Sequence, residues 1–163
     1  MIFRTLLIAS FLIFLGGNAL QAQEYDYIGA AKCKVCHNKA STGAQYKIWA
    51  EGPHANALSV LSAEEAKDPK CLKCHATAGH ADPNYIAGLK MDEGVSCESC
   101  HGPGSGYKSN TVMKSREKSL ENGLILPTEE VCVKCHNEES PTFKGFDYAE
   151  YVKKIAHPNP AKE

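Results

Sequence analysis

Two residue types occur together in this sequence at a repeated spacing. The chain has 163 residues, with eight cysteines and seven histidines. All eight cysteines lie in four copies of Cys-x-x-Cys-His, at residues 33–37, 71–75, 97–101 and 132–136. Two thiols one helical turn apart can form thioethers with the two vinyl groups of a haem, and the adjacent histidine then lies under the iron. The pattern predicts four covalently attached haem c groups, bound by Cys33, Cys36, Cys71, Cys74, Cys97, Cys100, Cys132 and Cys135.

Zinc ribbons and disulfides are the alternative uses of these cysteines. Two pairs of Cys-x-x-Cys can bind one zinc, and an exported chain can oxidise its thiols to disulfides. Neither use explains a histidine after every second cysteine. Histidine makes up 7 of 163 residues, so four such positions would be filled by chance about 3 times in a million, from composition alone. The histidines therefore favour haem.

Four irons have eight axial positions, and the sequence cannot fill all of them with histidine. The proximal ligands are expected to be the motif histidines, His37, His75, His101 and His136. Only His54, His80 and His157 remain as distal ligands. At most three haems can therefore have two histidine ligands from one chain, since haem iron favours imidazole.

The remaining iron has an open site or another ligand. Met91, Met113 and Tyr107 are the candidates within the chain. Methionine more often fills gaps between apolar groups, and for Tyr107 we favour a ring packed against a porphyrin. A partner chain in an oligomer or a larger redox complex is a further source of the eighth ligand.

The first 22 residues are typical of a secretory signal peptide. Arg4 precedes an apolar run at residues 6–15, and small residues lead to a cleavage position after Ala22. An uncleaved anchor is the alternative, but the run is shorter than the about 20 apolar residues that span a bilayer. We therefore expect one mature domain, residues 23–163, in the periplasm or otherwise exported, with no stable membrane span.

Composition bears on partners and on fold class. The formal net charge is −1, with 18 Lys and Arg against 19 Asp and Glu, which argues against nucleic acid as a partner. Helices are expected at 42–51 with Ser41 as N-cap, 54–61, 111–121, from 127 through the fourth motif, and from a cap at Asp147 to about 155. Residues 62–65 have the pattern of a capping box that starts a further turn. No convincing strand alternation is present. The expected fold is mainly α with much irregular chain, organised around covalent haems.

Three segments resemble the multihaem cytochrome c family typified by tetrahaem cytochrome c-554. They are 27–29 with Trp49 and 52–55, the block 94–105 around the third motif, and the closing stretch 132–157. The resemblance implies haems in close-packed pairs, mostly with two histidine ligands, and His54 and His157 as distal ligands. It also implies electron transfer between periplasmic partners. Many relatives carry histidine where this chain has Tyr107.

Electron transfer between redox partner proteins is the leading functional hypothesis, with no catalytic residue and no enzymatic activity. A small reductase of nitrogen oxides, using an open haem, is an alternative. Such a reductase also needs acidic or cationic groups beside the iron, and Arg116 is the only arginine outside the signal peptide. A subunit of a redox complex or of a haem wire is the other alternative.

The four complete motifs predict the mass of the mature protein. Under denaturing conditions it should equal the polypeptide mass plus four haems, because thioether bonds survive unfolding. Mass spectrometry of the purified protein checks this expectation. A polypeptide that loses its cofactor on denaturation, or that carries zinc, would contradict it.

Overall fold

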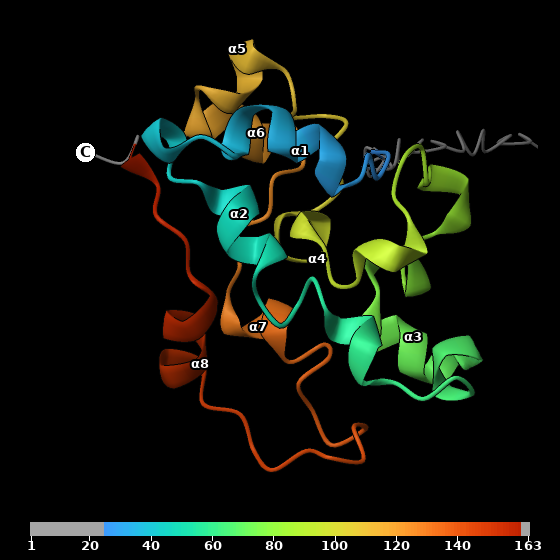
Figure 1. The fold of residues 1–163 in the computed structure, drawn as a ribbon. Helices are drawn as coiled ribbons and strands as arrows, with labels where there is room; N and C mark the ends of the chain where they lie inside the picture. The colour runs from blue at the N-terminus through green and yellow to red at the C-terminus, as the bar shows by residue number, and fades with distance from the viewer. Residues whose placement is uncertain (1–24, 161–163) are drawn as a thin grey trace, which may run out of the picture.

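The protein is described by a computed structural model that places residues 25–160. The described part is built from short helices joined by irregular chain (Figure 1). The α-helices are α1 (Ala30–His37), α2 (Gln45–Ala50), α3 (Pro69–His75), α4 (Cys97–His101), α5 (Asn110–Met113), α6 (Arg116–Glu121), α7 (Glu129–Cys132) and α8 (Tyr148–Ile155). Single 3-10 turns lie at Ala40–Thr42, Ala57–Val60, Glu65–Lys67, Thr77–Gly79, Pro83–Tyr85 and Met91–Glu93.

Extended pairing between residues 25 and 160 is limited to one parallel bridge, between Tyr27 and Ile86. The predicted fold class is therefore confirmed: the chain is mainly helical, with much irregular structure. The predicted signal peptide, residues 1–22, lies outside the described residues.

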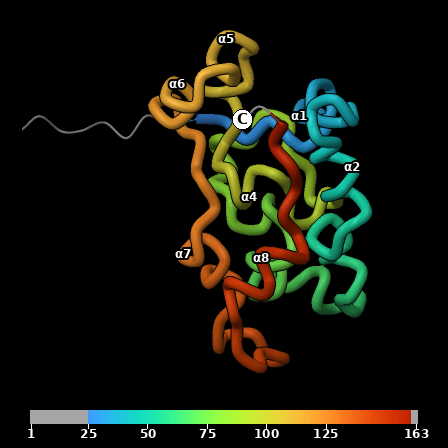
Figure 2. Tube along the Cα trace, turned by 90° about the vertical axis from the view of Figure 1, so that its left-hand side faces the viewer, coloured from blue at the N-terminus to red at the C-terminus, as the bar shows by residue number. Residues whose placement is uncertain are grey.

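Helix α4 lies near the middle of the molecule in both views (Figures 1 and 2). In Figure 1, α1, α5 and α6 lie above it, α2 lies to its left and α7 lies below it; in Figure 2, α1 and α2 lie together to its right. After α8 the chain runs back towards the start of α2, where the side chain of Gln45 donates to the carbonyl of Pro158 at 2.9 Å. This return brings the C-terminal segment and His157 to the same part of the molecule as α1 and α4.

Side-chain caps explain where several helices begin. The carboxylate of Asp68 accepts from the amide of Lys70 at the start of α3, and Asp147 accepts from the amide of Glu150 at the start of α8. Both bonds satisfy amides that have no partner within the helix. The predicted cap at Asp147 is confirmed. The chain also forms the reciprocal capping box of Ser62 and Glu65 that its sequence suggests.

Three predicted helices are shorter than expected. The prediction for 42–51, with Ser41 as N-cap, is wrong at its start: α2 begins at Gln45, because Gly43 and Ala44 have positive φ angles of 101° and 50°. Residues 54–61 contain only a 3-10 turn. The segment 111–121 is divided into α5 and α6, since Ser115 caps a new helix by accepting from the amide of Lys118.

The buried apolar side chains form only a small core. Among the described residues, the buried apolar side chains are Ile28, Ala30, Ala76, Ala81, Leu89 and Tyr107. Three of these six are alanines, which contribute little apolar area. No described helix is long and apolar enough to cross a membrane.

Candidate haem-binding site

Each Cys-x-x-Cys-His motif lies at or next to the C-terminal end of a helix. The motif histidine is the last residue of α1, α3 and α4. Helix α7 ends earlier, at Cys132, so the rest of the fourth motif lies in the following turn and not in a helix as predicted. In all four cases at least the first cysteine is held in helical backbone, which sets the direction of its side chain.

Cysteines of different motifs lie beside one another. The thiol of Cys97 lowers the pKa of Cys33, and Cys33 together with burial raises the pKa of Cys97. In a second pair, burial and the neighbouring Cys74 raise the pKa of Cys135 to about 12. The first motif therefore adjoins the third, and the second adjoins the fourth.

A third contact connects the two pairs. Burial and the charge of Cys132 raise the pKa of Cys100, so the third motif also lies near the fourth. Motifs far apart in sequence thus follow one another in space in the order first, third, fourth, second. Haems attached to these cysteines would form one connected cluster.

Two pairs of histidine rings lie close together, and each pair joins a motif histidine to a second histidine. The ring centroids of His54 and His136 are 6.0 Å apart, and those of His101 and His157 are 5.9 Å apart. Metal–imidazole bonds of about 2 Å would place two rings on opposite sides of one metal about 6 Å apart, centroid to centroid. Both distances therefore fit an iron between a motif histidine and a second histidine.

The protonation of these rings suits iron binding. Burial is the main cause that lowers the pKa of His54 and His101, and the neighbouring His136 and His157 lower them further. A lowered pKa favours the neutral imidazole, which is the form that binds a metal.

Backbone carbonyls orient two of the motif histidines. The Nδ1 atom of His75 is 2.7 Å from the carbonyl oxygen of Ala57, and that of His101 is 3.3 Å from the carbonyl oxygen of Ile125. A carbonyl only accepts, so in the neutral ring Nδ1 carries the proton and Nε2 keeps its lone pair. This arrangement fixes the tautomer and the ring direction in many metal sites.

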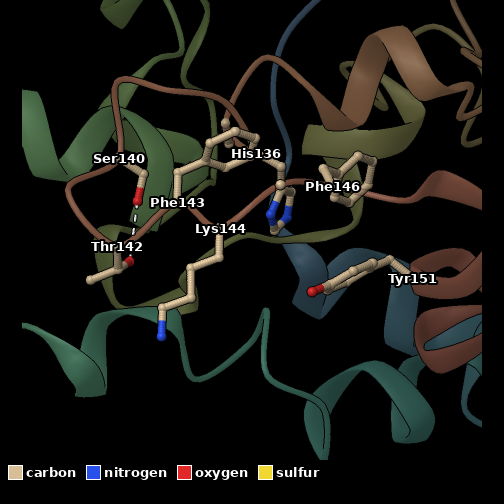
Figure 3. Close-up of a pocket in the computed structure, with 9 residues that line it drawn as sticks. His136, Ser140, Thr142, Phe143, Lys144, Phe146 and Tyr151 are labelled. Carbon is tan, nitrogen blue, oxygen red and sulfur yellow. Dashed lines mark hydrogen bonds between the residues drawn. The ribbon is translucent and has the colours of Figure 1, made fainter.

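The fourth motif borders a cavity of about 240 Å³ (Figure 3). Phe146 is stacked on the His136 ring, with centroids 4.9 Å apart and planes inclined by 18°, and Tyr151 lies next to Phe146. Phe143 and Lys144 also line the cavity. One face of His136 is therefore covered by an aromatic side chain, which restricts rotation of the imidazole.

A buried carboxylate joins the first motif to the third. Glu98, inside the third motif, is 2% exposed. Its two oxygens accept from the amides of Ile28 at 2.9 and 3.1 Å, Gly29 at 2.8 Å and Gly104 at 2.6 Å. Two of these amides lie just before α1, where a negative charge is favourable. Because every bond to Glu98 comes from an N–H group, it is held as an acceptor-only carboxylate.

Glu93 adds a second carboxylate at the start of α1. It accepts from the amide of Ala30 at 2.8 Å. Burial raises the pKa of Glu93, and the nearby charge of Glu98 raises it further. Gly29 has a φ of 82°, and a Cβ atom there would lie 2.6 Å from the carbonyl oxygen of Gly88. The start of α1 is thus fixed by two acidic side chains and by close backbone contact.

His80 and Tyr107 lie outside the two histidine pairs. His80 is near the second motif, with Nδ1 3.1 Å from the carbonyl oxygen of Lys73. Within the described range, no ring pair like the two above involves His80, His37 or His75. The hydroxyl of Tyr107 donates to the backbone carbonyls of His101 at 3.1 Å and Gly102 at 2.8 Å. The Tyr107 side chain is therefore held against the backbone at the end of the third motif.

Glu98 and Phe146 were missed by sequence reasoning. A charged residue between the two cysteines of a motif resembles an ordinary surface position, as Lys34, Lys73 and Lys134 do in the other motifs. The sequence feature that could have indicated the burial of Glu98 was its place among small residues and glycines. Phe146 gave no local signal, since its contact with His136 depends on the path of the loop between them.

Comparison with known proteins gives a family match and one curated relative. Residues 32–102, which include the first three motifs and His54, match the family described as cytochrome c554 and c-prime. Cytochrome c-554 from Nitrosomonas europaea is 28% identical over 169 aligned residues, covering 85% of this chain and 70% of the relative. No solved structure gives a significant match.

The contacts of Glu98 predict a large effect on stability. In Glu98→Gln the new NH₂ group faces backbone donors, so at least one buried amide loses its acceptor. The free energy of unfolding should fall by about 2–4 kcal/mol. Denaturant unfolding of the haem-loaded protein, followed by circular dichroism, measures this loss. Glu93→Gln is the matched control and should lower the free energy of unfolding clearly less, because Glu93 accepts one hydrogen bond from a backbone amide. Equal stability of the two variants would contradict the assignment.

Proposed function

We propose that this chain, whose residues 32–102 match the cytochrome c554 and c-prime family and which is 28% identical to cytochrome c-554, is a periplasmic tetrahaem carrier between redox proteins. Covalent haem c and a role in electron transfer follow from the family. The proposal adds three points: the number of haems, the residues that hold each haem, and the compartment.

Haem c supplies reversible one-electron chemistry at its iron. The eight motif cysteines would hold four such groups, and His37, His75, His101 and His136 would be the proximal ligands. Covalent attachment suits this chain because its own side chains bury little apolar surface. The residues present therefore fit four haems that form much of the interior.

The facing rings support an assignment of distal ligands. His54 would serve the iron of the fourth motif, since it faces His136, and His157 would serve that of the third, since it faces His101. His80 is then left for the first or the second motif. One of these two irons has no second histidine from the chain, so one site is open or filled by another group.

The proposal depends mainly on the spatial order of the four motifs: the first lies next to the third, the third next to the fourth, and the fourth next to the second. In each successive pair of motifs in that order, a cysteine of one motif shifts the pKa of a cysteine of the other. Attached haems would then lie close together, and close packing is what rapid electron exchange requires. The first and second motifs are the two ends of this path.

The compartment is inferred from the N-terminal segment and the cysteines. We propose that residues 1–22 are removed on export and that residues 23–163 form the mature domain. Cytochromes of this type keep their cysteines as thioethers, which suits an oxidising compartment where free thiols do not persist.

A redox titration tests the carrier function. The oxidised protein should take up four electrons per chain from dithionite, and a protein oxidant should then remove all four. A carrier should not consume nitric oxide or nitrite beyond what its stored electrons reduce. Sustained turnover with either compound would instead favour the reductase, and fewer than four electrons would contradict the haem count.

Substitution of the two distal histidines tests the site. His54→Ala and His157→Ala should each convert one low-spin haem to high-spin, because each iron loses one strong ligand, with all four haems still attached. Low-temperature electron paramagnetic resonance and mass spectrometry measure the two properties. His80→Ala is a useful comparison, since no ring pair predicts which iron it affects. Unchanged spectra in both variants would remove His54 and His157 from the ligand set.

A further inference from the structure

Positive charge is concentrated around the first motif. Residues 27–50 contain Lys32, Lys34, Lys39 and Lys47 and no aspartate or glutamate, although acidic and basic residues are nearly equal over the whole chain. These lysines belong to α1, α2 and the connection between them, which lie together on one side of the molecule (Figure 2). We call these four lysines, with Val35, the lysine face.

The charges of the lysine face are largely unpaired. Lys32, Lys34 and Lys39 are exposed and form no ion pair with any residue between 25 and 160. Lys34 lies over the ring of Tyr46, 5.1 Å from its centroid. Lys47 is 4.0 Å from Glu51, but both side chains are largely exposed, so this pair is weak.

Haem attachment leaves this face uncovered. At about 100° per residue, Val35 lies on the side of α1 opposite Cys33 and His37, with Lys32 and Lys34 on either side of Val35. Val35 is 72% exposed and is the apolar centre of the lysine face. The carboxylates of Glu93 and Glu98 do not neutralise the lysines by pairing, because they accept from backbone amides at the start of α1.

The opposite end of the proposed path has a different charge pattern. Around the second motif, residues 62–75 contain three lysines and three acidic residues. Lys67 pairs with Glu64 at 3.5 Å, and Lys73 pairs with Glu139 across the fold. The two ends of the haem series are therefore electrostatically distinct, with net positive charge only at the first motif.

We propose that the lysine face is the docking surface for an acidic redox protein, which exchanges electrons with the haem of the first motif. This inference rests on the carrier function proposed above and adds the identity of one end and the charge of its partner. Unpaired lysines would attract an acidic surface and speed its encounter. A small apolar centre within a charged rim suits a complex that must form and separate quickly.

Charge reversal at Lys32 and Lys39 tests the proposal, because neither residue lies between the cysteines of a motif. The probe is reduced flavodoxin, an acidic one-electron donor, mixed with the oxidised protein in a stopped-flow instrument at low ionic strength. The second-order rate should fall about tenfold or more in Lys32→Glu/Lys39→Glu. The wild-type rate should also fall as salt is added, since salt screens the attraction.

Lys67→Glu/Lys70→Glu is the matched control, with the same change in net charge beside the second motif. Its rate should stay within about twofold to threefold of wild type, because it alters only the long-range charge of the molecule. An equal fall in the second-order rate in both variants, or a wild-type rate that does not depend on salt, would contradict the assignment of the lysine face as the docking surface. Uptake of four electrons from dithionite by every variant separates this result from a failure of the carrier function.

Discussion

The carboxylate of Glu98 is the interaction on which the arrangement of the first and third motifs depends. Its bonds reach the chain before α1 and the glycine-rich turn after α4, so one side chain sets the distance between two segments about 75 positions apart. A carboxylate is well suited to this role, because two oxygens can accept several amides and a negative charge is favourable at the start of a helix. An apolar residue here would leave buried amides without acceptors.

The rest of the chain follows from having little apolar core. Its helices are one or two turns long, and isolated helices of that length are unstable in water. Caps and backbone contacts hold their ends, and haems attached at the motifs would stabilise them further. The histidine rings that lie 5.9 and 6.0 Å apart come from widely separated segments, so these contacts also connect distant parts of the fold.

Local chemistry predicted the fold class and two of the caps, because each depends on a few adjacent residues, although the predicted cap at Ser41 was wrong. The cap at Asp147 and the capping box at Ser62 are examples. Helix lengths were predicted less well: the positive φ angle of Ala44 and the new cap at Ser115 interrupt patterns that looked continuous. The pairing of His54 with His136 and the burial of Glu98 depend on tertiary contacts, which no short window of sequence contains.

The spatial order of the motifs interleaves the two halves of the polypeptide. The first pair joins residues near 33 and 97, and the second joins residues near 74 and 135, so each pair has one member before and one after the middle of the chain. No cut in the connection between the second and third motifs leaves a half with a complete pair. The two pairs are therefore not separate sequence modules, and a ribosome must release the chain as far as Cys135 before the second pair can close.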